Sequence, residues 1–415
     1  MDGHKKKGLL IECLFPFVFL LISLCSIYGK FIDKYIPPLN GYVANLQKSE
    51  RTLKNIANGS YQKYLGDKWG NSFCGRNVLI RLRGQILYSL FHTSQNANLI
   101  IGKDNYIFEN QYIFSEMVDS RIADDAWSVT DSRMDDIIAK IVKLKELLSK
   151  HGKELYIMIS PSKGYFCKDK WPLPFRILEG NLTYFPDHYD KRKSVRFSEK
   201  LWNAGIPNLN CTDYIENCNK EINAPVFYPT GVHWAHSWGT LCAIRLLEMI
   251  SENGRHVFPP ISILEEENEI PLWPDADIYG SLNLAVPARK LKISWWEPKV
   301  KVEDVFYSDI QIKPTVFFRG CSFMGQSLAN VSVSDIFSKV YHYENNYCII
   351  KKLDTNDQEV LMLNSYTDYK ELPIDEYLGE SDILILETNE RALGDISFGF
   401  IDYLLEHSDF CDNDY

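Results

Sequence analysis

A serine that directly follows an apolar segment is the first candidate for chemistry. The sequence Val316-Phe-Phe-Arg-Gly-Cys-Ser-Phe-Met-Gly325 predicts a strand, a sharp turn at Gly320 and a helix that begins near Ser322. In open parallel sheets, reactive groups gather where strands end and helices begin. A hydroxyl there can attack an acyl carbon if a base takes its proton, and backbone N–H groups at the helix start can stabilise an oxyanion. The same residue type is also a common structural helix cap.

A histidine upstream could supply the base. His233 lies in Phe227-Tyr-Pro-Thr-Gly-Val-His-Trp-Ala-His-Ser-Trp-Gly239, just before a predicted helix. Imidazole exchanges protons near neutral pH, which suits a general base. The structural alternative is a loop histidine packed on Trp234. His233 and His236 could also form a metal pair, but no third ligand follows at a recognisable spacing. We therefore predict neither a metal nor another cofactor.

A third polar group ends another apolar segment. Leu155-Tyr-Ile-Met-Ile159 predicts a strand, and it runs into Ser160-Pro-Ser-Lys163. If the strands are parallel, these residues lie at the same edge of the sheet as the serine. Ser162 and Lys163 are therefore candidates for substrate binding. The structural alternative is a turn that contains proline.

The elements that must position these residues alternate along the chain. Apolar segments predict strands at 99–101, 106–108, 155–159, 316–318 and 383–386, and amphipathic patterns predict helices at 132–151, 190–204 and 237–252. Strands that are apolar throughout and alternate with helices are typical of an α/β fold whose mainly parallel sheet is covered on both faces. The proline-containing stretch 265–301 is expected to be a long irregular insertion.

The N-terminus has the pattern of a membrane anchor. Residues 1–7 carry three lysines, and residues 8–29 are long and apolar enough for a helix to cross a bilayer. Lysines before such a segment favour a cytoplasmic tail. The expected protein is a single-pass protein of the plasma (inner) membrane with a helical stem at 30–98 and an extracytoplasmic α/β domain at 99–415. A cleaved signal peptide is the competing interpretation, although no small-residue cleavage site follows.

Charge and cysteine content narrow the range of partners. The net charge is −10 and no long basic block exists, so nucleic acid is not an expected partner. The ten cysteines include no C-x-x-C pair, which argues against a zinc finger. Cys211 and Cys218 flank a short polar loop that a disulfide could close in an exported protein. Buried free thiols are the alternative.

Five short motifs in a fixed order resemble a known family. They are Ile100-Ile-Gly-Lys-Asp-Asn-Tyr-Ile-Phe108, Pro161-Ser-Lys163, His233-Trp234 followed by Trp238-Gly239, Gly320-Cys-Ser-Phe323 and Leu386-Glu-Thr-Asn-Glu-Arg391. From about Tyr61 onward the chain is similar to the AlgX/AlgJ-type group of membrane-anchored, SGNH-hydrolase-like proteins that serve in O-acetylation of exported polysaccharides.

The resemblance implies roles for particular residues. It implies Ser322 as the nucleophile and His233 as the base, in an SGNH-like sheet flanked by helices. Trp234 and Arg391 belong to the matching motifs and are candidates for substrate binding. A multi-pass membrane acyl exporter is the donor partner that the resemblance implies.

One position departs from the family pattern. The family carries an aspartate two residues before this histidine, and here that position is Gly231. The acid of a serine triad orients the imidazole, and its loss costs about four orders of magnitude in rate. Asp275, Asp277 and Glu387 are the possible substitutes, and the sequence does not choose among them. Restoring the acid by Gly231→Asp is expected to raise turnover of a small aryl acetate.

Two classes of function follow from this sequence. The first is an exported O-acetyltransferase or acetylesterase that acts on a cell-envelope polysaccharide or exopolysaccharide through a Ser-His site. The second is a non-catalytic carbohydrate-binding or assembly factor of a polysaccharide acetylation system, because the usual acid is missing. The aromatic platforms of such a factor would be Trp234, Trp238, Trp295 and Trp296. An anchored scaffold with a decayed site is a third option.

Overall fold

The computed structural model describes residues 20, 35, 38–40, 47–72, 75–117, 129–182, 192–303, 313–331, 336–345, 347–354, 357–361 and 373–407. The chain divides into two compact units. Unit 1 comprises Met1–Ala97 and Ile278–Leu291, and unit 2 comprises Asn98–Asp277 and Lys292–Tyr415. The segment 8–29, predicted as the membrane anchor, lies outside the described residues except for Leu20. Among the residues that are described, none of the helices combines the length and the apolarity needed to cross a bilayer.

Among its described residues, unit 1 has helices within the range predicted as a stem. They are α2 (Leu53–Ala57), α3 (Ser60–Ser72) and α4 (Arg76–Phe91). Helix α4 packs on the segment 278–291, and a Cβ atom at its buried Gly84 would lie 2.9 Å from the carbonyl oxygen of Leu282. Glycine at this position therefore allows the close approach of the two backbones.

Unit 2 is built on a seven-stranded sheet with the order β10-β9-β8-β7-β11-β3-β4. The strands are β3 (Glu154–Ser160), β4 (Asn208–Asn210), β7 (Thr315–Gly320), β8 (Lys339–Glu344), β9 (Tyr347–Asp354), β10 (Asp357–Leu361) and β11 (Ile383–Asn389). The five strands from β8 to β4 run parallel, and β9 and β10 continue the sheet antiparallel. The predicted α/β class with a mainly parallel sheet is confirmed.

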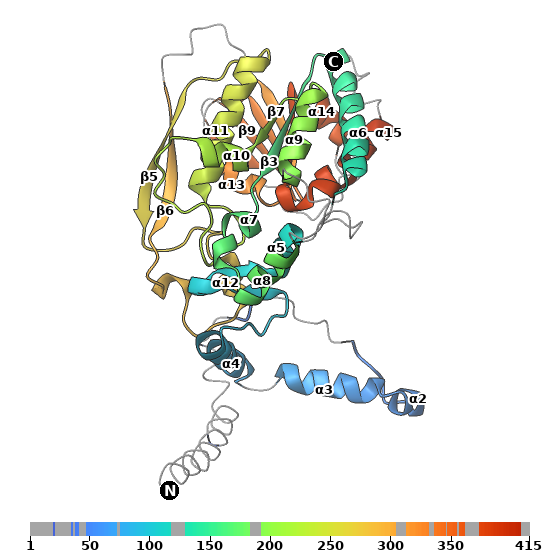
Figure 1. Ribbon diagram of the computed structural model, residues 1–415. Coiled ribbons are helices and arrows are strands. Elements are labelled where there is room, and N and C mark those ends of the chain that lie inside the picture. Colours follow the sequence, from blue (N-terminus) through green and yellow to red (C-terminus); the bar gives the residue numbers. More distant parts are fainter. Residues whose placement is uncertain are drawn as a thin grey trace. The chain divides into compact units, whose positions relative to one another are not determined.

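Helices cover both faces of this sheet (Figure 1). One face packs against α6 (Asp131–Lys150), α9 (Lys193–Asn203) and α15 (Phe400–Glu406), and the other packs against α11 (His236–Asn253) and α13 (Met324–Val331). On β3, Leu155, Ile157 and Ile159 belong to the first core, whereas Met158 faces α11 and α13. Because successive side chains point to opposite faces, a strand that is covered twice is apolar throughout.

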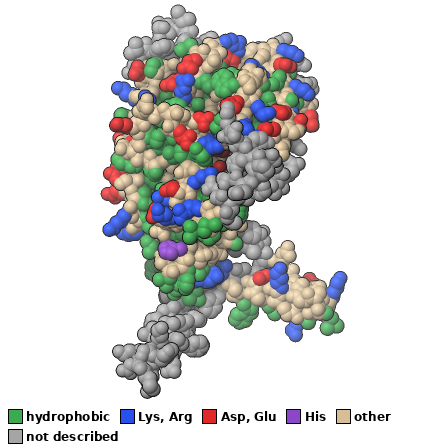
Figure 2. Space-filling view, in the orientation of Figure 1, with side chains coloured by type: hydrophobic (Ala, Val, Ile, Leu, Met, Phe, Trp, Pro, Cys, Tyr) green, Lys and Arg blue, Asp and Glu red, His purple; other side chains and the backbone are tan. Residues whose placement is uncertain are grey.

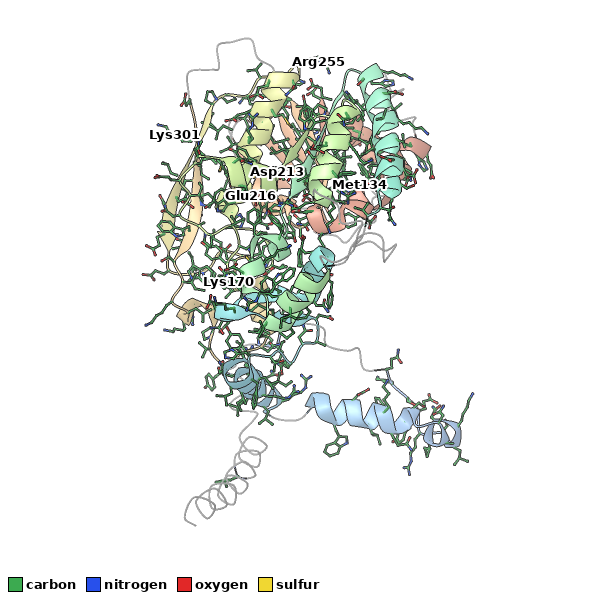
Figure 3. The ribbon with its side chains drawn as sticks, viewed as in Figure 1. Met134, Lys170, Asp213, Glu216, Arg255 and Lys301 are labelled. Carbon is green, nitrogen blue, oxygen red and sulfur yellow. The ribbon has the colours of Figure 1, made fainter. Side chains whose placement is uncertain are left out.

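Shorter elements complete the described part of the chain. They are β1 (Leu99–Ile101), β2 (Ile107–Glu109), α5 (Asn110–Met117), α7 (Lys163–Phe166), α8 (Leu173–Leu182), α10 (Cys211–Asn217), α12 (Asp277–Ser281), α14 (Ile374–Gly379) and the 3-10 segments η1 (Lys103–Asn105), η2 (Lys168–Lys170), η3 (Ala288–Lys290) and η6 (Glu390–Gly399). Figure 3 labels Asp213 and Glu216 on α10, and Glu216 accepts a hydrogen bond of 2.8 Å from the Tyr165 hydroxyl.

The stretch expected to be irregular is partly a β-ribbon. Strands β5 (Ile261–Asn268) and β6 (Trp295–Val302) pair antiparallel, with Glu265 opposite Pro298. Lys301, labelled in Figure 3, lies on this ribbon. A two-stranded ribbon consists only of edge strands, which tolerate a proline that a central strand would exclude. The prediction of an irregular insertion was therefore wrong for its two ends.

The possible disulfide between Cys211 and Cys218 is absent, and both residues are free thiols. Helix α10 fills the space between them. Seven residues of helix rise roughly 10 Å, whereas a disulfide needs Cα atoms less than about 7 Å apart. The helix therefore excludes the bridge that the spacing suggested.

Charged side chains are mixed on the surface of unit 2. Figure 2 shows Asp and Glu side chains among Lys and Arg side chains on the face in view. A nucleic-acid site would instead collect basic side chains into a patch or stripe. This face therefore gives no reason to revise the expectation that nucleic acid is not a partner.

Candidate active site

Three side chains from distant parts of the sequence form a hydrogen-bonded chain in unit 2. Ser322 Oγ lies 2.7 Å from His233 Nε2, and His233 Nδ1 lies 2.7 Å from Asp277 Oδ2. Because a carboxylate accepts the proton on Nδ1, the lone pair of Nε2 faces the serine hydroxyl. This is the arrangement of a Ser-His-Asp triad, in which the imidazole can take the serine proton.

The nucleophile candidate stands in a tight turn between β7 and α13. Ser322 is partly buried and lies two residues after Gly320, the last residue of the strand. Glu387 of β11 lies beneath the turn, where its Oε2 atom accepts the backbone N–H of Cys321 at 2.8 Å. A Cβ atom at Gly320 would lie 2.5 Å from that same oxygen. Glycine therefore lets the turn rest directly on the Glu387 carboxyl group.

The histidine belongs to a loop that is closed around a buried lysine. The two ends of the loop 227–234 form an antiparallel bridge. Inside it, Lys163 Nζ donates hydrogen bonds to the carbonyl oxygens of Tyr228 at 2.8 Å, Pro229 at 3.2 Å and Gly231 at 2.5 Å. Burial lowers the pKa of Lys163 to about 8. Three donated hydrogen bonds use all the protons of the ammonium group, so Lys163 fixes the loop that carries the histidine.

The structure corrects three of the four residues predicted to bind substrate. Ser162, Lys163 and Trp234 are fully buried. The indole N–H of Trp234 donates to the carbonyl oxygen of Phe323 at 2.9 Å, which ties the histidine loop to the serine turn. Arg391 alone of the four is partly exposed, and its guanidinium lies 4.9 Å from the ring centroid of Tyr112. Because Ser162, Lys163 and Trp234 are buried, they support the residues that react and do not face a substrate.

Of the three candidate acids, Asp277 is the one bonded to the histidine. Its second oxygen, Oδ1, accepts the backbone N–H of Val232 at 2.9 Å, so both carboxylate oxygens hold the histidine loop. Glu387 instead accepts the Ser160 hydroxyl at 2.5 Å and the Cys321 N–H, and burial raises its pKa to about 7. Its geometry fits a support of the serine turn and not a partner of the imidazole.

Asp275 is the third candidate, and it is buried away from the imidazole. It is 1% exposed, and among the described residues neither of its carboxyl oxygens has a hydrogen-bond partner. Burial, followed by the nearby charge of Asp277, raises the pKa of Asp275 from 3.8 to about 8. A carboxyl group in such a place is most stable when it is protonated.

This burial predicts how stability depends on pH. Because the pKa of Asp275 is higher in the folded state, its contribution to the free energy of unfolding is lost as pH rises from about 4 toward about 8. We expect Asp275→Asn to raise Tm by several degrees at pH 8 and to change it little at or below about pH 4. Thermal unfolding across this range measures the difference, with Asp136→Asn on the exposed side of α6 as the control. Parallel curves for wild type and Asp275→Asn would contradict the assignment.

Gly231 leaves no space for the acid that the family pattern carries. A Cβ atom at Gly231 would lie 2.7 Å from the carbonyl oxygen of Pro274 and 2.8 Å from that of Asp275. We therefore revise the expectation that Gly231→Asp raises turnover, because Asp277 already bonds to the imidazole and the segment beside it touches the glycine. Gly231 lacks the usual acid, and Asp277 supplies a carboxylate to the imidazole in its place.

The opposite result is now expected at this position. Gly231→Ala and Gly231→Asp should both lower Tm and turnover, because either side chain must push the Asp275 segment away from the loop. The control is Gly379→Ala, since a Cβ atom at Gly379 would have no neighbour within 4 Å. Thermal unfolding and aryl acetate hydrolysis test both variants. A Gly231→Asp protein as stable and as active as wild type would refute this steric argument.

One residue near the histidine was missed by the sequence interpretation. The ring centroid of Trp273 lies 6.0 Å from that of His233, and Trp273 is 71% exposed. The tryptophans proposed as platforms are different, because Trp234 and Trp295 are buried and the Trp238 indole N–H donates to the carbonyl oxygen of Ala224. The signal for Trp273 was its position two residues before Asp275, in a stretch read only as irregular.

A metal is not needed to explain the histidines. His236 Nε2 lies 2.9 Å from the carbonyl oxygen of Trp273, so its ring holds the neighbouring backbone. Within the part of the chain that the structure describes, no group of three or more His, Cys, Asp and Glu side chains is placed to hold a metal ion.

Comparison with known proteins gives matches among solved structures alone. No family model and no curated protein matches the chain. The O-acetyltransferase domain of Pseudomonas putida AlgJ matches with a TM-score of 0.43 and 15% identity, over 72% of this chain and 92% of that chain. Pseudomonas aeruginosa AlgX matches with a TM-score of 0.41 and 12% identity, over 73% of this chain and 67% of that chain. Bacillus cereus PatB1 matches with a TM-score of 0.43 and 12% identity, over 71% of this chain and 97% of that chain. AlgJ and AlgX are the two proteins after which the resembled family is named.

Proposed function

We propose that unit 2 is an O-acetyltransferase or acetylesterase that acts on an exported polysaccharide. Ser322 is the nucleophile, His233 the general base and Asp277 the acid of its triad. The observation that carries the proposal is the pair of 2.7 Å contacts from Ser322 through His233 to Asp277. Residues 44 and 89 positions from the histidine converge on its two ring nitrogens, which is the relation a serine hydrolase needs.

The reaction begins with transfer of an acetyl group to the serine. His233 Nε2 takes the proton of Ser322 as Oγ attacks the acetyl carbon, and Asp277 stabilises the imidazolium. The carbonyl oxygen gains negative charge close to the N-terminal end of α13, whose helix dipole favours an anion. Collapse of the intermediate releases the donor alcohol, which receives the proton from His233. The product of this half is acetyl-Ser322.

The second half decides between transfer and hydrolysis. A sugar hydroxyl or a water molecule attacks the acetyl carbon, and His233 takes its proton as the bond to Ser322 Oγ breaks. His233 then returns the proton to Ser322. A sugar held in place gives an acetylated polysaccharide, whereas water gives acetate.

The substrate and the cellular place rest on the sequence. The five motifs resemble proteins of polysaccharide O-acetylation, and the apolar segment 8–29 behind three lysines favours a single-pass anchor in the plasma (inner) membrane. Unit 2 would then act outside the cytoplasm. A multi-pass acyl exporter in the same membrane would supply the acetyl groups.

The non-catalytic alternative loses its main support in the structure. It was favoured because Gly231 replaces the usual acid, but Asp277 holds the imidazole in the way that acid would. A binding protein has no need for a carboxylate on Nδ1 and a hydroxyl on Nε2 of one histidine.

Transfer to a sugar tests the proposal. Purified full chain is mixed with an aryl acetate and a panel of oligosaccharides, and the products are separated by mass. Acetylated sugar or free acetate should form with wild type at rates well above those with Ser322→Ala. Equal rates for the two proteins, both correctly folded, would favour the binding function instead.

A further inference from the structure

Trp273 is exposed where a large aromatic ring would ordinarily be covered. It is 71% exposed, although its ring centroid lies 6.0 Å from that of His233. The other ring packed on His233, that of Phe323 at 4.8 Å, is 1% exposed. The two rings that lie near the imidazole therefore differ in exposure, because Phe323 is buried and the Trp273 ring is accessible to a ligand.

The backbone under Trp273 is held in place. Its carbonyl oxygen lies 2.9 Å from His236 Nε2. In the same segment, the backbone N–H of Asp275 donates to Leu272 O at 2.8 Å, and the N–H of Asp277 donates to Pro274 O at 3.1 Å. Trp273, which presents the ring, and Asp277, which orients His233, therefore lie in one tight turn. A ring on a fixed backbone loses little conformational freedom when a ligand stacks on it.

Two polar side chains lie in the region of His236, which binds the Trp273 backbone. The ends of the β5–β6 ribbon carry Asn268 and Glu297, whose amide and carboxylate are joined by a hydrogen bond of 2.9 Å. The charge of Glu297 acts on His236, which binds the Trp273 backbone.

We infer that Trp273 is the platform on which a pyranose ring of the acceptor stacks, so that acetyl-Ser322 is attacked by a sugar hydroxyl in preference to water. This inference rests on the proposed function. The C–H face of a pyranose is apolar and can lie about 4 Å above an aromatic face, with its hydroxyls pointing outward from the ring edge. A sugar on Trp273 then brings a hydroxyl to His233, which is 6.0 Å away between ring centroids.

The transfer of acetyl to the sugar needs only the sugar hydroxyl, acetyl-Ser322 and His233. The hydroxyl oxygen forms a bond to the acetyl carbon as its proton passes to His233 Nε2, and the bond from that carbon to Ser322 Oγ breaks. His233 then returns the proton to Oγ. Hydrolysis uses the same groups without the platform, so loss of Trp273 should affect transfer and spare the reaction with water.

Partitioning of the acetyl-enzyme tests this inference. The full chain is first acetylated by an aryl acetate. Water, methanol and a pyranose then compete for the acetyl group, and the pyranose probes are methyl β-glucopyranoside and cellopentaose. With wild type, the pyranoses should receive acetyl more efficiently than methanol at the same hydroxyl concentration. Trp273→Ala should reduce transfer to the pyranoses roughly five- to tenfold and leave hydrolysis and methanolysis unchanged. Trp273→Phe should restore much of the transfer.

Controls separate this inference from the proposed function. Trp202→Ala removes an exposed tryptophan of α9, on the other face of the sheet, and should leave transfer unchanged. If no acetyl-enzyme forms on Ser322, the proposed function fails. If it forms, but pyranoses gain no advantage over methanol, or Trp273→Ala lowers transfer and hydrolysis equally, the platform is wrong and the triad stands.

Discussion

Asp277→Asn is expected to lower Ser322-dependent turnover by about four orders of magnitude with little change in fold. The asparagine oxygen can still accept the N–H of Val232, so the loop keeps one of its two contacts. Its amide NH2 would then face His233 Nδ1 and donate to it, which places the histidine proton on Nε2. In that tautomer Nε2 cannot accept the proton of Ser322. Steady-state hydrolysis of an aryl acetate measures the effect.

The two other acids serve as matched controls. Asp275→Asn should leave turnover near that of wild type, because its carboxyl group contacts neither the imidazole nor the serine in the described structure. Glu387→Gln should cost much less than Asp277→Asn, since a glutamine oxygen can still accept the Cys321 N–H. The reverse ranking, with Glu387→Gln the most damaging variant, would show that Asp277 is not the acid of the triad.

Lys163→Met is expected to have the second largest effect. It removes the donor from three carbonyl oxygens of the histidine loop, and each buried polar group left without a partner costs about 1–3 kcal/mol. We expect a loss of several kcal/mol in the free energy of unfolding. Turnover should fall at least about 100-fold in whatever protein folds, because small displacements of a catalytic group have effects of this size.

Denaturant unfolding and single-turnover acylation measure the two parts of this prediction. The control is Lys145→Met, which removes an exposed lysine that donates to one backbone carbonyl, that of Gly205. It should leave stability and acylation almost unchanged. If Lys163→Met also behaved like wild type in both assays, the lysine would have no part in fixing the loop.

The serine and the histidine could be predicted because local sequence marks their positions. An apolar strand, a glycine and a serine predict the turn at Ser322, and the His-Trp motif before a helix predicts the loop at His233. The strands around them are apolar on both faces, which is why the core sheet was also predictable. The polar strands β8, β9 and β10 were missed, since they contain lysine, glutamate and aspartate among apolar residues.

The acid could not be chosen because its position depends on tertiary structure. Asp275 and Asp277 lie two residues apart, yet the carboxyl group of the first is buried with no hydrogen bond from the described residues, and that of the second holds the imidazole. Burial also decided against Lys163 and Trp234 as substrate ligands, and a sequence motif does not tell whether a side chain faces the opening or the core. For the same reason Trp273 was passed over, although it is the tryptophan that is exposed beside His233.

Detection of acetyl-Ser322 tests the central claim most directly. Full chain is mixed with an aryl acetate, quenched in acid after short intervals and digested for peptide mass analysis. The account predicts that the peptide containing Ser322 gains the mass of an acetyl group within one turnover, and that the same peptide gains none in His233→Ala. A correctly folded wild-type protein whose Ser322 peptide is never acetylated, or is acetylated equally without His233, would contradict it.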